Sequence, residues 1–249
     1  MKVGLFVPCY VDVVYPEVGH ATYKLLRSLG VDVVYPEKQT CCGQPMANAG
    51  FEKMAHPLVA SFEELFKGCD YVVAPSASCA AFVRVFHPRL LSQMGHNPED
   101  CEAHGKTMDL VEFLHDTLQV ESLPAKFPHK VSVHNSCHGV RELALSSPSE
   151  RNIPKFNKII DLLRLVEGIE IFEPERPDEC CGFGGMFAVE ESAVSARMGL
   201  DKVRRHMATG AEYITGPDSS CLMHMRGVAA KNSLPIKFIH VVEILAAGL

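Results

Sequence analysis

The sequence has no tryptophan, no long apolar run and no block of basic residues. A membrane-spanning helix needs about 20 consecutive apolar residues, whereas the longest apolar runs here are short, such as residues 3–8. The chain carries 24 Lys and Arg against 30 Asp and Glu, a net charge of −6, which disfavours nucleic-acid or anionic-membrane binding. Because the residues after Lys2 do not form a secretory signal, we expect a cytoplasmic protein with no integral membrane segment.

Several common catalytic signatures are also missing. The chain shows no Ser-His-Asp arrangement, paired-carboxylate signature or phosphate-binding loop, and residues 182–185 (GFGG) lack the spacing of a dinucleotide-binding loop. The 249 residues are 47% hydrophobic and 22% charged, which fits a globular protein of one or two domains and excludes a disordered or fibrous chain. The informative feature is the set of ten cysteines, too few for a disulfide scaffold and typical of metal ligands or redox thiols in a reducing compartment.

The chain repeats itself. Four blocks of the first half match four blocks of the second in the same order: residues 2–9 with 130–137, 35–43 with 173–182, 70–79 with 212–221, and 109–114 with 240–245. The offsets drift only by loop-sized amounts, which indicates a duplicated unit of about 120 residues. The junction falls in residues 121–128, which contain two prolines. We therefore predict two domains, residues 1–124 and 125–249.

Each repeat alternates short strand-like runs with helical patterns. Residues 3–7, 31–35 and 71–74 are rich in Val, Tyr and Phe, and residues 131–134, 169–172 and 213–215 correspond to them. Nearly continuous apolar runs indicate strands buried on both faces of a parallel sheet. Helical faces lie between them, at Leu58, Phe62, Leu65 and Phe66 and at Ile159, Leu162, Leu163 and Val166. The predicted fold class is α/β, with two duplicated pseudo-symmetric units and mostly parallel sheets.

Eight cysteines occupy equivalent positions on this map, each just after a predicted strand: Cys9, Cys41, Cys42, Cys79, Cys137, Cys180, Cys181 and Cys221. The carboxyl ends of parallel strands lie along one edge of the sheet, so we expect four thiols to converge in each half. Four thiolates can hold an iron–sulfur cluster or a tetrahedral zinc ion. Neighbouring cysteines, as in Cys41-Cys42, reach two irons of a cluster more easily than one mononuclear ion, which favours a cluster.

The spacing of these cysteines resembles the CCG cysteine-rich domain, given twice. That domain occurs in the cysteine-rich component of heterodisulfide reductase and in the iron–sulfur component of glycolate oxidase. Residues 75–79 (PSASC) and 217–224 (PDSSCLMH), together with the plan of two such domains, are most similar to the lactate utilization protein A family. The resemblance covers almost the whole chain.

The resemblance implies an iron–sulfur, electron-transfer subunit in the oxidation of L-lactate, or a similar 2-hydroxy acid, to the 2-oxo acid. It implies action with lactate utilization proteins B and C. Carried over by position, the metal ligands of one [4Fe-4S] site would be Cys9, Cys41, Cys42 and Cys79, and those of the other Cys137, Cys180, Cys181 and Cys221. The sequence departs from the Cys-x-x-Cys ending of reductase-type domains, since Phe82 and His224 stand at the closing positions. Phe82 cannot ligate, whereas an imidazole can replace a thiolate, so His224 joins the candidate ligands.

Two other interpretations of the thiols stay open. One or both sites could hold zinc in a scaffold protein, or the adjacent cysteines could form a thiol–disulfide enzyme within a heterodisulfide-reductase-like complex. Outside the two sets, Cys69 aligns with Ala211 and is expected to be structural, and Cys101 to be a surface thiol. His138, beside Cys137, is positioned to hydrogen-bond to a metal-bound sulfur. The charged helix that contains Lys202 is expected to be solvated.

Overall fold

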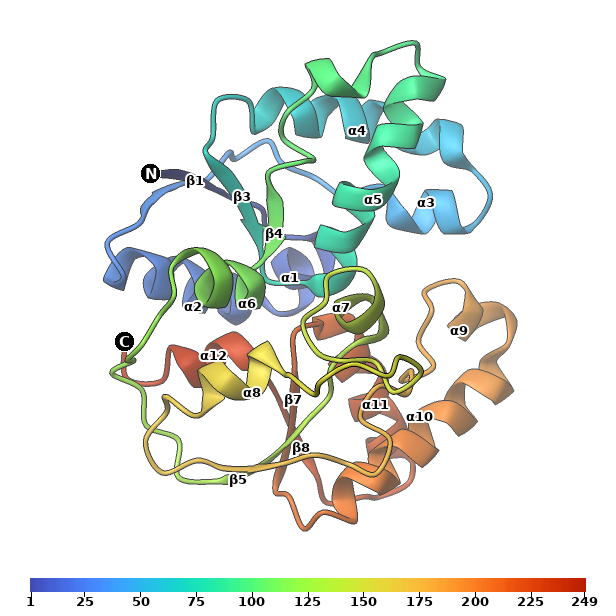
Figure 1. Ribbon diagram of the computed structural model, residues 1–249. Helices are drawn as coiled ribbons and strands as arrows, with labels where there is room; N and C mark the ends of the chain where they lie inside the picture. Colours follow the sequence, from blue (N-terminus) through green and yellow to red (C-terminus); the bar gives the residue numbers. More distant parts are fainter.

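The computed structural model describes residues 1–249 as two α/β units stacked on one another (Figure 1). The first unit contains β1 (Lys2–Leu5), α1 (Cys9–Val14), α2 (Pro16–Ser28), β2 (Asp32–Val34), α3 (Gln44–Asn48), α4 (Glu52–Leu65), β3 (Tyr71–Ala74), α5 (Ala77–Gln93), a 3₁₀ turn η1 (Pro98–Asp100), β4 (Thr107–Asp109), α6 (Leu110–Glu112) and a π-helical turn η2 (Phe113–Thr117). The second unit contains β5 (Lys130–Val133), α7 (Cys137–Arg141), α8 (Lys158–Leu163), β6 (Glu170–Phe172), α9 (Phe187–Glu190), α10 (Ser192–Met207), β7 (Tyr213–Gly216), α11 (Ser219–Lys231), β8 (Lys237–His240) and α12 (Val241–Leu245).

Both units have the same sheet. The strand order is β2-β1-β3-β4 in the first and β6-β5-β7-β8 in the second, and every pairing is parallel. The registers also correspond, since Val3 pairs with Tyr71 as Val131 pairs with Tyr213. The prediction of a duplicated α/β fold with parallel sheets is therefore confirmed.

The sequence pattern missed some details of each unit. The fourth strands, β4 and β8, were not predicted, because they are only three and four residues long and mix polar with apolar side chains. In α4 and the residue after it, Phe62 and Phe66 are buried as predicted, whereas Leu58 and Leu65 are half-buried and Ala55 and Val59 complete the buried face.

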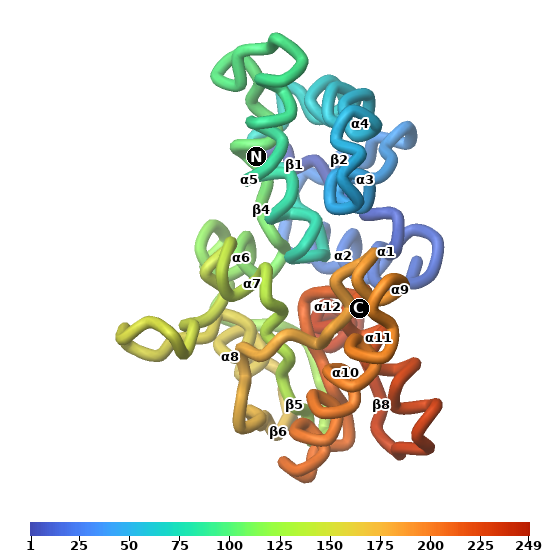
Figure 2. The backbone as a smooth tube through the Cα atoms, turned by 90° about the vertical axis from the view of Figure 1, so that its right-hand side faces the viewer, coloured from blue at the N-terminus to red at the C-terminus, as the bar shows by residue number.

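Four helix pairs join the two units reciprocally. The second unit's α12 packs on α2 of the first, and the first unit's α6 packs on α8 of the second. In the same way α5 packs on α7, and α11 packs on α1. Figure 2, turned by 90°, also shows α1 and α2 of the first unit lying against α11 and α12 of the second. The units are thus related as a pseudo-symmetric pair.

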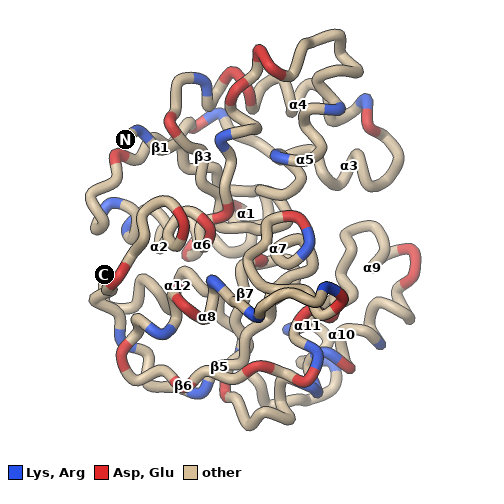
Figure 3. Tube along the Cα trace, viewed as in Figure 1, with Lys and Arg blue, Asp and Glu red and all other residues tan.

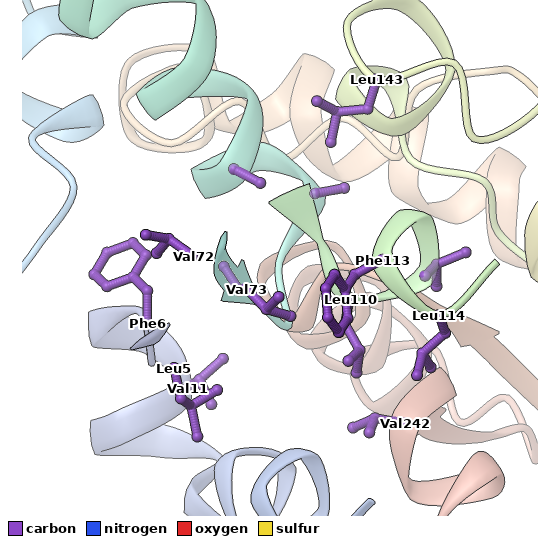
Figure 4. Close-up of a cluster of buried hydrophobic side chains, with 14 of the residues drawn as sticks. Leu5, Phe6, Val11, Val72, Val73, Leu110, Phe113, Leu114, Leu143 and Val242 are labelled. Carbon is purple, nitrogen blue, oxygen red and sulfur yellow. The ribbon is translucent and has the colours of Figure 1, made fainter. Parts of the chain in front are cut away.

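One hydrophobic core crosses the junction between the units. Figure 4 shows Leu110, Phe113 and Leu114, which follow β4, beside Val242 of α12. These side chains belong to one cluster of 45 buried residues that also includes Leu5 and Val73 of the first sheet and Val131 and Val133 of the second. The predicted boundary between residues 124 and 125 therefore divides two units that share one core, and the boundary itself stays a prediction.

Charged residues are distributed over both units. Figure 3 shows Lys and Arg interleaved with Asp and Glu along the chain. One expectation about charge was wrong: Lys202 in α10 is fully buried, not solvated, and its Nζ donates to the carbonyls of Arg176 and Pro177 at 2.7 and 3.3 Å. No helix combines the length and apolar character that a membrane crossing requires.

Candidate metal centre

A cavity of about 260 Å³ lies where the two units meet. All eight cysteines of the two repeated sets line it: Cys9, Cys41, Cys42, Cys79, Cys137, Cys180, Cys181 and Cys221. The sequence predicts one pocket in each half, whereas both sets of cysteines face this common cavity. The reason is the packing of α5 on α7 and of α1 on α11, which turns the strand ends of the two sheets toward each other.

Three loops of each unit deliver the thiols. In the first unit Cys9 begins α1 directly after β1, Cys41 and Cys42 follow β2, and Cys79 lies in the first turn of α5 after β3. The second unit repeats the arrangement with Cys137 at the start of α7 and Cys221 in the first turn of α11. Sulfur atoms separated by more than 30 residues in sequence are therefore brought together by the carboxyl edge of each sheet.

The thiols of each set interact with one another. Hydrogen bonds from Cys42 and Cys9 lower the pKa of Cys41 to about 3, and the same contacts together with burial raise the pKa of the two donors. In the second unit, hydrogen bonds from Cys137 and Cys181 lower the pKa of Cys180 to about 2. One thiolate per set is thus stabilised by its neighbours.

A glycine follows each cysteine pair because the turn requires one. Gly43 and Gly182 have φ values of 94° and 89°, a region that other residues rarely adopt. Their backbone N–H groups donate to the sulfurs of Cys41 and Cys180 at 3.4 and 3.3 Å. At Gly182 a Cβ atom would stand 2.6 Å from Cβ of Met198 and 2.8 Å from the carbonyl oxygen of Ser195. The Cys-Cys-Gly turn therefore fixes one donor on each thiol set.

Aromatic side chains cover part of the cavity. Tyr10 of α1 meets Phe183 of the second unit edge to face, with ring centroids 5.9 Å apart. Both rings line the cavity beside the cysteines. This contact shields the thiols from water and adds an apolar link between the units.

Asp218, which the sequence analysis did not single out, lies buried between the two sets and is 1% exposed. Its carboxylate accepts hydrogen bonds from Ser76 and Ser78 of the first unit and from Ser136 of its own unit. Burial raises its pKa, but the hydrogen bonds from Ser136 and Ser78 prevail and hold the pKa of Asp218 below its ordinary value. Its signal in the sequence was the acidic residue that replaces Ser76 in the second repeat.

Backbone strain accompanies this contact. Ser136, immediately before Cys137, has φ 61° and ψ 135°, an unfavourable conformation for a residue with a side chain. Its hydroxyl donates to Asp218, which holds the residue in place. The equivalent Pro8 in the first unit has an ordinary φ of −63°. The strain is therefore particular to the second thiol set.

His134 is the second residue that the sequence analysis missed. It follows β5, is fully buried, and contributes with Cys181 and Cys221 three potential ligand atoms that all lie within 4.8 Å of one another. Burial, assisted by the charge of Lys202, lowers the pKa of His134 to about 3, so the imidazole is neutral. Its sequence signal was a polar residue at the position that Phe6 occupies in the first repeat.

The other sequence candidates take different positions. Nδ1 of His138 lies 3.7 Å from the Cys137 sulfur, and the ring lines the cavity. His224 does not line it; its Nε2 donates to the carbonyl of Ser195 at 3.2 Å. Phe82 is buried and stacks on Phe86. Cys69 is buried beneath Gly4, outside the cavity.

Comparisons with known proteins agree with this arrangement. A family model described as "Cysteine-rich domain" (CCG) matches residues 3–84 and again 131–226, one match in each unit. The chain is 37% identical over 246 residues to lactate utilization protein A 1 of Bacillus mycoides (strain KBAB4), covering 98% of this chain and 96% of that one.

Two further relatives carry the same name. Lactate utilization protein A of Geobacillus thermodenitrificans (strain NG80-2) is 36% identical, with 98% of both chains covered. The protein of that name from Halalkalibacterium halodurans is 37% identical, covering 98% of this chain and 96% of its own. The chain therefore belongs to the CCG cysteine-rich domain family and is similar over nearly its whole length to lactate utilization protein A.

Proposed function

We propose that this protein is an iron–sulfur electron-transfer subunit in the oxidation of L-lactate, or of a similar 2-hydroxy acid, to the 2-oxo acid. The observation that carries the proposal is the convergence of eight thiols, in two sets of four, on one sheltered cavity. The substrate is inferred from the names of the relatives. The partners, lactate utilization proteins B and C, are inferred from the family resemblance.

The residues present fit iron–sulfur clusters. Each set offers four sulfurs, the number that a [4Fe-4S] cluster takes from a protein. Backbone N–H groups of Gly43 and Gly182 already point at sulfur, as expected where negative charge must be stabilised. A bound cluster would supply reversible one-electron transfer, which no side chain of this cavity can provide.

The protein's own residues would control the surroundings of the clusters. The eight cysteines would hold the irons, while Tyr10 and Phe183 limit the access of water. Asp218 keeps the loops that carry Cys79 and Cys137 at a fixed separation through its serine contacts. The buried negative charge of Asp218 also disfavours added electrons nearby, so it is expected to lower the reduction potential of the clusters.

Anaerobic reconstitution with iron and sulfide tests the proposal. We expect about four irons and four sulfides per filled set, visible absorption that bleaches on reduction, and a paramagnetic signal from the reduced protein. Cys42→Ser and Cys181→Ser should each lower the iron content of one set. Cys69→Ser, a buried cysteine outside the cavity, should retain wild-type iron.

Other results would reject the proposal in favour of the remaining readings. A colourless protein without iron after reconstitution contradicts it. Stoichiometric zinc, with spectra that do not change on reduction, would identify a zinc scaffold. Reversible loss of two thiols in the absence of metal would identify a thiol–disulfide enzyme.

A further inference from the structure

The side chains packed behind the two thiol sets differ in polarity. The strand registers place His134 at the position of Phe6, and both backbone N–H groups donate to the adjacent central strand, at Thr215 and Val73. Beneath the first set Phe6 packs edge to face on Phe62 and Phe66, with centroids 5.1 and 5.9 Å apart. The side chains that pack on Phe6 in this layer are therefore aromatic and apolar.

In the second unit this layer is polar. His134 lies beside His206, with ring centroids 6.2 Å apart, and Ser132 is hydrogen-bonded to Nδ1 of His206 at 2.7 Å. The buried ammonium of Lys202 is directed to the carbonyls of Arg176 and Pro177. Lys202 and Nδ1 of His206 thus have hydrogen-bond partners, and Nε2 of His206 is buried without one.

Neither ring nitrogen of His134 has a hydrogen-bond partner, although the residue is 0% exposed. Leaving a buried polar group unpaired destabilises the folded protein, so an imidazole here calls for a further partner. Gly216 leaves the space that His134 occupies, because a Cβ atom at Gly216 would stand 2.6 Å from the carbonyl oxygen and 3.4 Å from the Cβ of His134. Nothing in the protein uses the imidazole's lone pair.

The position of that lone pair fits a metal ligand. One nitrogen of His134 and the sulfurs of Cys181 and Cys221 lie within 4.8 Å of one another, yet no hydrogen bond joins the ring to either sulfur. Nitrogen and sulfur ligands that sit 2.0–2.3 Å from one tetrahedral metal are roughly 3.5 Å apart. Small side-chain adjustments would therefore let all three contact one ion.

We propose that His134 is a metal ligand of the second thiol set and forms a mixed nitrogen–sulfur site with Cys181 and Cys221. His224 does not line the cavity, and its Nε2 contacts the Ser195 carbonyl at 3.2 Å. The first set has no counterpart, because Phe6 stands at the equivalent position and the nearby His87 contacts the Cys42 carbonyl at 2.9 Å. The two centres are therefore chemically different.

The proposal rests on the proposed function only for the identity of the metal. A zinc ion would take all three atoms, whereas in a [4Fe-4S] cluster, where each iron takes one protein ligand, His134 would hold one iron in place of one of the four thiolates. If the metal is iron, replacing a thiolate by a neutral imidazole raises the reduction potential of a centre. The second centre should then accept an electron before the first. Removal of the imidazole should bring the two potentials closer together.

The site itself is tested by titrating Co²⁺ into the full-length, reduced, metal-free protein. The wild type should show absorption typical of tetrahedral cobalt with mixed nitrogen and sulfur ligands. His134→Phe, which copies the first unit, should weaken binding at the second set at least about tenfold and alter the spectrum. His224→Gln, which keeps a donor for the Ser195 carbonyl, should match the wild type. Failure of the wild type to bind Co²⁺, or wild-type affinity and spectrum in His134→Phe, would overturn the proposal.

A second measurement needs no variant and so does not depend on how His134→Phe folds. Wild-type protein with ¹⁵N-labelled histidine is reconstituted with iron and sulfide, reduced and examined by pulsed electron paramagnetic resonance. Nitrogen coupling of the strength of a directly bound imidazole supports the proposal, and its absence from a cluster-loaded second set contradicts it. A mixed-ligand cobalt site in a protein that takes up no iron would retain this inference while rejecting the proposed function.

Discussion

Asp218 of the second unit accepts hydrogen bonds from both the backbone N–H and the hydroxyl of Ser78 in the first unit, at 3.0 and 2.7 Å. The two residues are 140 positions apart in the sequence. Each lies beside a cysteine loop, so this contact links the two thiol sets. It is a buried polar bridge at the junction between the two units.

Asp218→Ala should lower the free energy of unfolding by about 2–4 kcal/mol. The serine hydroxyls and the N–H of Ser78, which donate hydrogen bonds to Asp218, would be left buried without a partner. The measurement is a denaturant titration of the wild type and the variant. Asp32→Ala removes an exposed aspartate and should change stability by no more than about 0.5 kcal/mol. Equal effects of the two substitutions would contradict the bridging role.

The shared core predicts that the two units unfold together. Phe113→Ala removes a fully buried ring and should cost about 3–5 kcal/mol while preserving one transition. Far-ultraviolet circular dichroism and tyrosine signals should give the same midpoint. Val13→Ala, at a side chain that is 77% exposed, serves as the control with little effect. Two separate transitions would show that the units are independent.

The Cys-Cys-Gly glycines should tolerate alanine to different degrees. Gly182→Ala meets both a positive φ and a backbone carbonyl at 2.8 Å, and Gly43→Ala meets a positive φ and the Ala55 Cβ at 3.0 Å. Gly50→Ala has a positive φ of 82° but nothing within 4 Å, so it should cost only about 1–2 kcal/mol. The denaturant midpoint should be highest for Gly50→Ala, lower for Gly43→Ala and lowest for Gly182→Ala. If Gly182→Ala were the least destabilising of the three substitutions, the close approach of the Ser195 carbonyl to Gly182 would be contradicted.

The buried carboxyl group of Asp109 should make the stability of the folded protein depend on pH. It caps α6 by accepting the N–H of Val111 at 2.8 Å, while its Oδ2 is buried without a partner. Burial raises the pKa of Asp109 well above its ordinary value, so the folded protein holds this proton after the unfolded chain has lost it. The resulting loss of stability begins as pH rises above about 4, the pKa of an unfolded aspartate, and is complete above the folded pKa.

Asp109→Asn keeps the cap and removes the charge. At neutral pH this variant should therefore be more stable than the wild type, by about 1–3 kcal/mol, and below about pH 4 the difference should vanish. Unfolding titrations across this pH range measure the difference. A wild type that is the more stable protein at neutral pH would show that the Asp109 carboxylate has a partner in the folded protein.

The sequence by itself determined the repeated unit, the parallel sheets and the placement of eight cysteines at strand ends. Apolar runs, turn residues and spacing are local signals, and the geometry of a parallel sheet converts Cys9, Cys42 and Cys79 into neighbours without further information. The same holds for Cys137, Cys181 and Cys221, because the second repeat has the same register.

Only the tertiary structure decided that both thiol sets share one cavity, that Asp218 bridges the units, and that Lys202 and His134 are buried. The shared cavity and the Asp218 bridge depend on how α5 packs on α7 and α1 on α11 across the junction. The burial of His134 and Lys202 depends on contacts with other segments of the second unit, such as those with His206 and Arg176. The alternation of apolar and polar residues along one element cannot specify such contacts, since it records only which face of that element is buried, not what lies against it.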